Sequence, residues 1–499
     1  MEHNYNRRFF PKTQQLLLPI DMTEWLKPND EVFIYQELLQ NLDLSKFYEH
    51  YRKDGEGGKF IDPVHLLGVL FYCSSNGIYS SRKIEEECIV NVRCRYLAGN
   101  MPIDHSTIAR FRQKNLDGIK DLFTQFLIIL HEAKMIDPRL LALDGTKIKA
   151  NASLSKNKTY KRLKQVAREF VENGQAADDA EKQSGIQETL RESATRKEIE
   201  ERIRRAKEIV EERHRAEVDL YDKKMKQREI EEKEAGKPKT GRKPKPPTSE
   251  PDPSEKANTT DPNSRVVKTR VGYEQGYNAQ SISTQNGFVV ANWVRSQEND
   301  LHQLIPALDM IHDLAERFGI DPAEITLLAD AGYFSYENMM TELSSEVNLM
   351  ISPSKELKLK SIPEGNGYAH EVQRICWGQG TGLLSCCAAS IGAWANEYLK
   401  QNGEWPTKEM IAKIIMGSRV ATEGGRKLYG MRKYMIESIF GIIKENRGFR
   451  AFHLRGLDGV NGEWALVNMC HNIKLGIKKG IGSFLKQRSL ENARAIAGF

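Results

Sequence analysis

The spacing of apolar residues along the chain predicts helices towards both ends and strands in the middle. Over Glu31–Ile119, apolar residues recur three or four positions apart, which indicates a compact all-helical region. Leu301–Phe318 has the same periodicity, and Gly462–Lys479 is expected to form a final apolar helix. Residues 265–296 instead contain alternating and β-branched runs around an Asn-Gly pair, which predicts a hairpin of two strands.

Two short apolar runs each end in an aspartate. RLLALD closes with Asp144 and ITLLAD closes with Asp330, and a glycine follows each aspartate within two residues. Residues 348–355 predict a further strand. Carboxylates at the ends of neighbouring strands can face one cleft, although each could simply cap the turn that follows it. Both aspartates are therefore candidate site residues whose role depends on acids elsewhere.

Long segments of a different character interrupt this pattern. Residues 155–236 are dense in Lys, Arg and Glu, which predicts long, largely solvated helices such as an antiparallel pair. Residues 236–262 are rich in Pro, Lys and Ser and predict a disordered linker. Residues 357–426 show little regular pattern, and their cysteines lack the paired spacing of a zinc site, which favours unliganded thiols over zinc. These cysteines are Cys376, Cys386 and Cys387.

These boundaries give the expected organisation of the chain. A helical N-terminal domain, expected to bind DNA, spans residues 1–135, and an α/β domain spans residues 136–480. The α/β domain is interrupted by the charged insertion with its linker, 155–262, and by a second insertion, 357–426. Residues 481–499 are expected to form a C-terminal tail. A chain of 499 residues is long enough to bury an ample core in this arrangement.

Composition narrows the class of protein. The formal net charge is only +6, but 74 Lys and Arg residues leave room for strongly basic faces. Seven cysteines without regular spacing indicate reduced thiols rather than a disulfide framework. Because no run of about 18 apolar residues predicts a membrane span, we expect a soluble, cytoplasmic protein without a membrane partner. The chain has no Gly-rich phosphate loop, which argues against an ATP-driven enzyme. It also has no serine or cysteine nucleophile with a matched base, so nothing supports covalent catalysis.

A third candidate acid lies in the stretch Tyr429–Leu457. Apolar residues recur there at helical spacing and predict a helix with one buried face. At about 100° per residue, Lys433 and Lys444 share the side of this helix that carries Glu437. Glu437 could be an ordinary surface partner of these lysines, or it could act together with acids elsewhere in the fold.

Basic and aromatic residues follow this helix. Arg447, Arg450 and Arg455 alternate with Phe449 and Phe452, a mixture suited to phosphates and unstacked bases. These three arginines are therefore candidate DNA contacts.

A second basic element lies in the helical N-terminal region. Asp104 or Ser106 is placed to cap a helix that carries Arg110 and Arg112. A recognition helix of a helix-turn-helix unit has this pattern, and so does any capped basic helix. We take Arg110 and Arg112 as candidate base readers.

The three acids Asp144, Asp330 and Glu437 together supply what a divalent-metal site needs. They offer hard oxygen ligands and negative charge while leaving coordination positions for water and a substrate phosphate, which fits magnesium. Two such ions can activate the attacking oxygen and stabilise the leaving oxygen in phosphoryl transfer. Other acids lack this paired context, namely Asp300, Glu445 and Glu463.

Three blocks of sequence resemble bacterial insertion-sequence transposases of the DDE superfamily. They are LDLSKFYEHY, GIYSSRKIEEEC and PIDHSTIARFR in the helical part, LALDGTKIKANAS, GYNAQ and LLADAGYFS in the core, and YGMRKYMIESIFGIIKENRGFRAFHLRGL near the C-terminus. The resemblance covers most of the chain outside residues 155–262 and 357–416. It implies an α/β fold with a ribonuclease H-like mixed sheet flanked by helices, an all-helical N-terminal domain and a long charged helical insertion.

The resemblance also implies roles for particular residues. Asp144 and Asp330 resemble the first and second catalytic aspartates of the family, and Glu437 resembles the closing glutamate. The family's signature of tyrosine, arginine, glutamate and lysine falls on Tyr429, Arg432, Glu437 and Lys444, with the basic pair on transposon-end phosphates. Relatives often place the arginine four residues before the glutamate, which is Lys433 here, so Arg432 and Lys433 both remain candidates for that position.

The expected function follows from this resemblance. It implies Mg²⁺-dependent cleavage at the ends of an insertion sequence and strand transfer into target DNA, with Mn²⁺ as a plausible substitute. The partners would be double-stranded DNA, both inverted-repeat ends and target, and a second copy of the chain in a homodimer or larger synaptic complex. The protein would associate with the nucleoid when bound to DNA. The alternatives are an inactive DNA-binding protein of the same fold and a metal-dependent nuclease without strand transfer.

Overall fold

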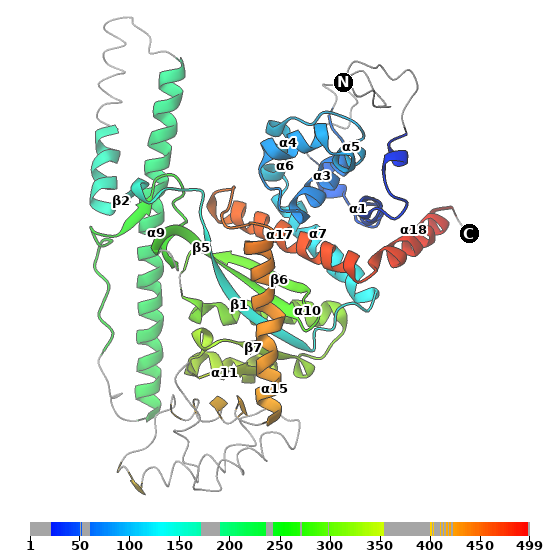
Figure 1. Cartoon of the computed structure of the whole chain (residues 1–499). Helices are drawn as coiled ribbons and strands as arrows, with labels where there is room; N and C mark the ends of the chain where they lie inside the picture. Colours follow the sequence, from blue (N-terminus) through cyan, green and yellow to red (C-terminus); the bar gives the residue numbers. More distant parts are fainter. Residues whose placement is uncertain are drawn as a thin grey trace, which may run out of the picture.

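The computed structural model describes residues 21–49, 51, 60–170, 190–235, 243–269, 272–297, 299–353, short stretches between 400 and 420, and 423–497. Figure 1 shows a helical region, a central sheet with helices on it, and a long helix that stands beside the sheet. Most of the expected second insertion, with its cysteines, lies outside the described residues. Within the described part, no helix is long and apolar enough to cross a membrane.

The N-terminal region is helical, as predicted. Its helices bury apolar residues at helical spacing, and aspartates accept backbone hydrogen bonds at several helix starts, because the first N–H groups of a helix have no partner within it. Asp104, rather than Ser106, caps the basic helix α6 by accepting from the backbone N–H of Ser106 at 2.8 Å. The elements are η1 (Met22–Trp25), α1 (Glu31–Gln40), α2 (Ser45–Tyr48), α3 (Pro63–Ser75), α4 (Ser81–Val90), α5 (Val92–Leu97), α6 (His105–Lys114) and α7 (Leu116–Glu132).

The centre of the molecule is a six-stranded mixed sheet. Its order is β4-β5-β1-β7-β8, and β6 pairs with β5. β1 pairs antiparallel with β5 and parallel with β7, and β7 pairs parallel with β8, so this is the ribonuclease H-like sheet that was predicted. The strands are β1 (Leu140–Lys149), β4 (Arg265–Thr269), β5 (Gly272–Thr284), β6 (Val289–Arg295), β7 (Thr326–Ala329) and β8 (Asn348–Ile351).

The predicted hairpin between residues 265 and 296 is confirmed. β5 and β6 pair antiparallel, and Gly287 in the turn between them has a φ of +82°, where a residue without a Cβ is favoured. Most of β5 is buried, from Gln275 to Thr284. A strand covered on both faces suits the centre of a layered α/β sheet.

Helices carry the remaining site-bearing segments against this sheet. The prediction over Leu301–Phe318 is confirmed as a short 3-10 turn that continues into α10. The elements in this part are η3 (Asp300–Gln303), α10 (Leu304–Phe318), η4 (Pro322–Glu324), η5 (Ala331–Tyr333), α11 (Tyr336–Ser345), α15 (Glu423–Arg432), the π-helical η7 (Lys433–Glu437), α16 (Ser438–Gly441) and the π-helical η8 (Ile442–Asn446).

The predicted final helix is α17 (Gly456–Lys478), which joins the sheet to the helical region. It packs on β6 and also on α3 and α7, and Trp464 within it is fully buried. The indole N–H of Trp464 donates to the Gln280 carbonyl oxygen of β5 at 2.9 Å. One continuous core therefore runs from the helical region into the sheet, so the boundary expected at residue 135 is not a break in packing.

The C-terminal segment expected to be a tail is instead the helix α18 (Ile481–Ala497). Ile481 and Leu485 are buried, and α18 packs against α1 of the helical region. The prediction was wrong because these two apolar positions, four residues apart, find a partner surface only once α1 is in place.

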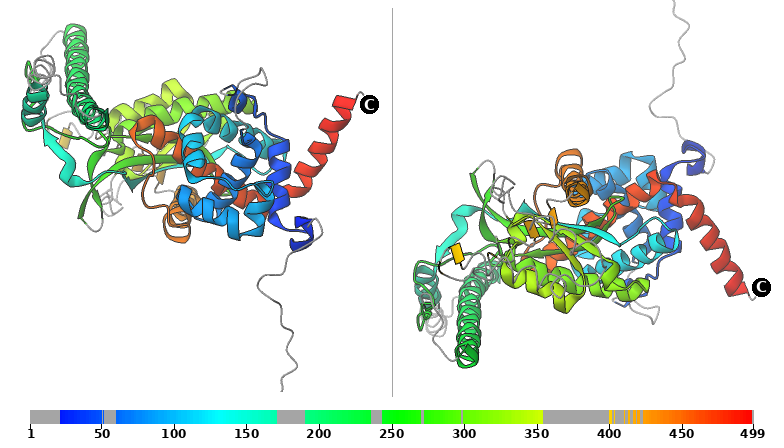
Figure 2. Two further views of the ribbon diagram at one scale, coloured as in Figure 1. Left: turned by 90° about the horizontal axis from the view of Figure 1, so that it is seen from above. Right: turned by 90° about the horizontal axis from the view of Figure 1, so that it is seen from below.

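The charged insertion forms its own small unit beside the sheet. The chain passes through η2 (Leu154–Lys156) and β2 (Asn157–Thr159), and α9 (Leu190–Ala235) is the long exposed helix at one end of the molecule, opposite α18 (Figures 1 and 2). β3 (Lys256–Asn258) pairs antiparallel with β2. A small core holds the unit together, made of Tyr160, Leu163, Ala206, Val210 and Ala257.

Residues 243–262 of the expected linker are therefore ordered, and the prediction of disorder is wrong for them. Asn258 is fully buried and donates to the Ser153 carbonyl oxygen at 2.8 Å, while its side-chain oxygen accepts from the Thr260 backbone N–H at 2.9 Å. The segment has few apolar residues because polar hydrogen bonds, rather than apolar burial, fix much of it.

Candidate active site

The strand register brings the two candidate aspartates to neighbouring positions. β1 and β7 are paired from Leu140 opposite Thr326 up to Leu143 opposite Ala329, and Asp144 and Asp330 are the next residues on each strand. Asp144 does not close its strand, as the sequence suggested, since β1 continues to Lys149 along β5. The parallel pairing ends there instead, so both carboxylates lie where the two strands separate.

Each aspartate uses one carboxylate oxygen for a backbone hydrogen bond. Asp144 Oδ1 accepts from the Gly145 N–H at 2.8 Å, and Asp330 Oδ1 accepts from the Gly332 N–H at 2.7 Å, which caps η5. The capping role and the candidate site role are thus compatible, because a carboxylate has a second oxygen.

The candidate glutamate is linked to Asp144 through Arg432. The Arg432 guanidinium donates to Glu437 Oε1 at 2.7 Å and to Asp144 Oδ2 at 3.3 Å, and only 12% of the Arg432 side chain is exposed. Glu437 itself is more open, with 45% of its side chain exposed. Arg432 therefore links Asp144 on β1 to Glu437 on η7.

The helix that carries Glu437 is not a regular α-helix, and this decides which basic residue faces the acids. Lys433–Glu437 and Ile442–Asn446 are π-helical, with a wider turn that bonds residues five apart. Arg432, five residues before Glu437, therefore shares its side, whereas α-helical geometry favours Lys433. Lys433 is exposed and makes no ion pair among the described residues.

The electrostatics of the site are dominated by burial and by its cluster of acids. Burial raises the pKa of the Asp144 carboxyl to about 7; Arg432 opposes this shift, and Asp330 and Glu437 reinforce it. Tyr429 ties the helix to β7, since its hydroxyl donates to the Ala329 carbonyl oxygen at 3.1 Å. Burial also raises the pKa of the Tyr429 hydroxyl, so this residue acts as a neutral donor.

The oxygen donors of this site fit a hard divalent cation in kind and in charge. Asp144 and Asp330 supply carboxylates at adjacent strand positions, and Glu437 supplies a third from the helix. The Arg432 guanidinium bonds both Asp144 and Glu437. In the described part of the chain, the carboxylate oxygens of Asp144, Asp330 and Glu437 do not all lie within 4.8 Å of one another. The arginine supplies positive charge beside the acids in this conformation.

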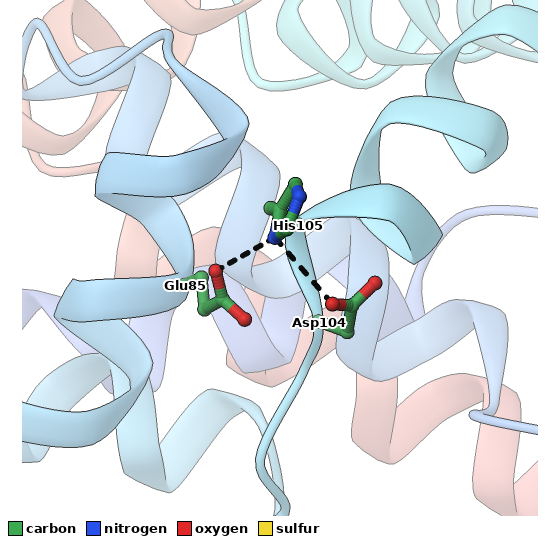
Figure 3. A group of neighbouring side chains, drawn as sticks. All are labelled: Glu85, Asp104 and His105. Carbon is green, nitrogen blue, oxygen red and sulfur yellow. Dashed lines mark hydrogen bonds and ion pairs between the residues drawn. The ribbon is translucent and has the colours of Figure 1, made fainter.

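A different group of three potential ligands does meet that distance, in the helical region. His105 Nδ1 lies 2.9 Å from Glu85 Oε2 and 3.4 Å from Asp104 Oδ2 (Figure 3). All three side chains are at least one-third exposed, and Asp104 already caps α6. Because the positive end of a helix dipole opposes a cation, we interpret the group as a hydrogen-bonded cluster at a helix start.

Among the predicted basic DNA contacts, Lys444 bonds within the protein, whereas Arg450 and Arg455 are exposed. Lys444 donates to Thr146 Oγ1 at 2.9 Å and to the Lys147 carbonyl oxygen at 2.8 Å, which anchors the helix on β1. Arg450 is exposed and pairs with Glu445. Arg455 is exposed, and its Nε donates to the Asn151 carbonyl oxygen at 3.0 Å.

Two of the predicted arginine contacts point inward. Arg112 is buried and donates to the Tyr79 carbonyl oxygen at 2.8 Å, while Arg110 on the same helix is exposed. Arg447 Nη1 is also buried, and the added charge of this residue lowers the pKa of the buried His471 imidazole further than burial alone. These placements argue against DNA contacts by Arg112 and Arg447. His471 is a core histidine, 3% exposed, whose ring bonds the Gly287 carbonyl oxygen.

The phenylalanines expected to stack on bases are core residues. Phe449 and Phe452 are each no more than 2% exposed, and Phe449 packs against Tyr79 and Trp464. The interpretation was wrong because Phe449 and Phe452 face the core, whereas Arg450 and Arg455 beside them are exposed.

One acid beside the site was undervalued from the sequence. Asp300 Oδ1 accepts from Asn278 Nδ2 at 2.6 Å and from Gln280 Nε2 at 2.8 Å, next to Gly145 of β1. A Cβ at Gly145 would lie 2.2 Å from Gln280 Nε2, so this contact requires glycine. The signal in the sequence was the alternation of Asn278 and Gln280, two polar residues on one face of a buried strand.

Glu463, another acid set aside from the sequence, has a structural role. It is 3% exposed, and its carboxylate accepts from the backbone N–H groups of His453 and Leu454 at 2.9 Å and from His453 Nδ1 at 2.8 Å. It therefore holds the segment after the Glu437 helix in place.

Replacing Glu463 with alanine is expected to lower the free energy of unfolding by about 3 kcal/mol, because two buried backbone donors lose a charged acceptor. Denaturant unfolding followed by circular dichroism measures this. Glu463→Gln keeps one acceptor and should lose about half as much, whereas Glu316→Ala, on the exposed face of α10, should lose little. Equal midpoints for Glu463→Ala and Glu316→Ala would contradict the assignment.

Two segments of the chain match known protein families. The family model described as a transposase domain (DUF772) matches residues 21–114, which hold α1 to α6. The model described as a transposase DDE domain matches residues 398–475, which include Tyr429, Arg432 and Glu437. No curated protein sequence matches the chain.

Among solved structures, the chain matches a pre-cleavage Mos1 transpososome at 8% identity, over 78% of this chain and 82% of that one. The TM-score is 0.18, so the superposition adds nothing to the topology described above. The two family matches flank the sheet in sequence and include the helix with the third acid. The first matched segment is thus similar to a transposase domain, and the second is similar to a transposase DDE domain.

Proposed function

We propose that this protein is a DNA transposase of the DDE superfamily, which cleaves DNA at the ends of a bacterial insertion sequence and joins the released 3′ hydroxyl to target DNA. The observation that supports this most directly is the meeting of Asp144 and Asp330 at the point where β1 and β7 separate, with Glu437 linked to Asp144 through Arg432. Two carboxylates that follow paired positions on adjacent strands, together with a helix glutamate, suit phosphoryl transfer better than any single acid would.

Asp144, Asp330 and Glu437 would hold the divalent metal that the family implies, with Mg²⁺ as the proposed ion and Mn²⁺ as a substitute. When bound, the metal polarises the phosphodiester and lowers the pKa of the attacking hydroxyl. The chain's own part is to keep the aspartates in register through β1 and β7 and to hold the helix on the sheet through Tyr429 and Lys444.

Exposed basic residues supply the proposed DNA contacts outside the acids. Arg450 and Arg455 lie after the helix, Lys433 lies beside it, and Arg110 lies on α6 of the helical region. We propose that the helical region binds DNA as a unit with the catalytic sheet, because one core joins them. Because the proposed reaction uses both ends of the insertion sequence, we further propose that the protein acts as a dimer or larger complex.

The test uses the DNA that flanks the coding gene, where terminal inverted repeats would identify the ends. The purified chain is incubated with a labelled end duplex and a plasmid target, with Mg²⁺, with Mn²⁺ or with a chelator. We expect end-specific nicks and joined products that require metal. Cleavage without end preference or joining would indicate a plain nuclease, and end binding without any nick would indicate an inactive DNA-binding protein.

A further inference from the structure

An open groove lies at the far end of β1, between the catalytic sheet and the charged insertion. It encloses about 720 Å³. The chain after β1 forms one side, from Lys149 through η2 to Lys156, and the start of β5 and the segment before α17 form the other. The insertion thus takes part in a surface that it shares with the sheet.

The lining of the groove carries an excess of positive charge. Its cations are Lys149, Lys156 and Arg455, and its acid is Glu274, which lies 3.4 Å from the Lys149 ammonium. Lys156 is exposed and has no ion-pair partner in the part of the chain that the structure describes. Arg455 bonds Asn151 through Nε, which orients the rest of its guanidinium. Such a surface suits the phosphates of a nucleic acid.

The walls of this groove are held by polar contacts between its segments. Asn157 donates to Gln275 Oε1 at 3.0 Å, which ties the insertion to β5, and Asn258 donates to the Ser153 carbonyl oxygen at 2.8 Å. The Asn151 side chain donates to the His453 carbonyl oxygen at 2.7 Å, which ties the two sides together. The cations are therefore presented from a preorganised frame, which lowers the entropy cost of binding.

We propose that this groove binds the backbone of duplex DNA that flanks the reacting phosphate, and that the charged insertion serves to complete it. The inference rests on the proposed function for the identity of the DNA. Lys149 is five residues beyond Asp144 on β1, or roughly 17 Å at about 3.3 Å per residue. At about 3.4 Å per base pair, the groove meets the duplex about five base pairs from the reacting phosphate.

The test measures how the binding of short duplexes depends on salt. Lys156→Gln and Arg455→Gln are each compared with the wild type on an end duplex and on a shuffled duplex, between about 50 and 200 mM salt. We expect each variant to bind several-fold more weakly at low salt on both duplexes. The slope of log affinity against log salt should become shallower by about 0.9 for each lost phosphate contact. Interference footprinting should lose a contact about five base pairs from the cleaved position.

Lys486→Gln, an exposed lysine on α18 at the other end of the molecule, is the matched control and should leave the slope unchanged. Thermal melting of each variant checks the fold, and Lys156→Gln tests the groove even if Arg455→Gln is destabilised. A slope for Lys156→Gln equal to that of Lys486→Gln would overturn the groove while leaving the proposed reaction intact. A changed slope in a protein that neither cleaves nor joins DNA would support the groove and overturn the reaction.

Discussion

Asp330→Asn is expected to reduce the rate of metal-dependent cleavage and joining by about 10³-fold, which corresponds to about 4 kcal/mol of lost transition-state stabilisation. The change removes a negative charge at the position where β1 and β7 separate and keeps the size of the side chain. An amide binds a hard divalent cation more weakly than a carboxylate does, so the loss should fall on the chemical step. Single-turnover assays with an end duplex measure it.

The fold of Asp330→Asn should be retained, since the asparagine side-chain oxygen can still accept from the Gly332 N–H that Asp330 caps. Asp309→Asn, on the exposed side of α10, is the matched control and should leave the rate near that of the wild type. If Asp330→Asn kept full activity in Mg²⁺, the assignment of the site would be wrong. Equal melting temperatures for the two variants would separate chemistry from folding.

Arg432→Gln is expected to lower the cleavage rate by about 100-fold, whereas Lys433→Gln should lower it by only a few-fold. Arg432 bonds Glu437 and Asp144 together, so its loss removes both the orientation of the more exposed glutamate and a buried positive charge. Lys433 makes neither contact and faces solvent. Adjacent positions on one helix provide closely matched variants, measured in the same single-turnover assay.

This pair of variants also tests the π-helical turn. If Lys433→Gln lost more activity than Arg432→Gln, an α-helical register at Glu437 would be the functional one. Arg432→Lys should recover only part of the rate, since one ammonium cannot make the two-sided contact of a guanidinium. DNA affinity measured on each variant distinguishes a lost phosphate contact, which weakens binding, from a lost effect on the acids alone.

Short-range patterns in the chain were enough to predict the elements that carry the site. The runs that end at Asp144 and Asp330, the hairpin around Gly287 and the apolar face of the helix around Glu437 are each encoded within a few residues. They were predictable because side-chain periodicity and turn preference depend on local backbone geometry, which neighbouring residues set.

Contacts between distant segments account for what the patterns missed. The strand register, which places Asp144 midway along β1, depends on β5 and β7 together. Arg112 is buried through a bond to Tyr79, 33 residues earlier, and Phe449 packs on the same Tyr79 of the distant helical region. No period in the local sequence marks the π-helical turns that bring Arg432 to Glu437. Apolar spacing identifies a buried helix face, whereas packing against the sheet selects the turn that places each polar side chain.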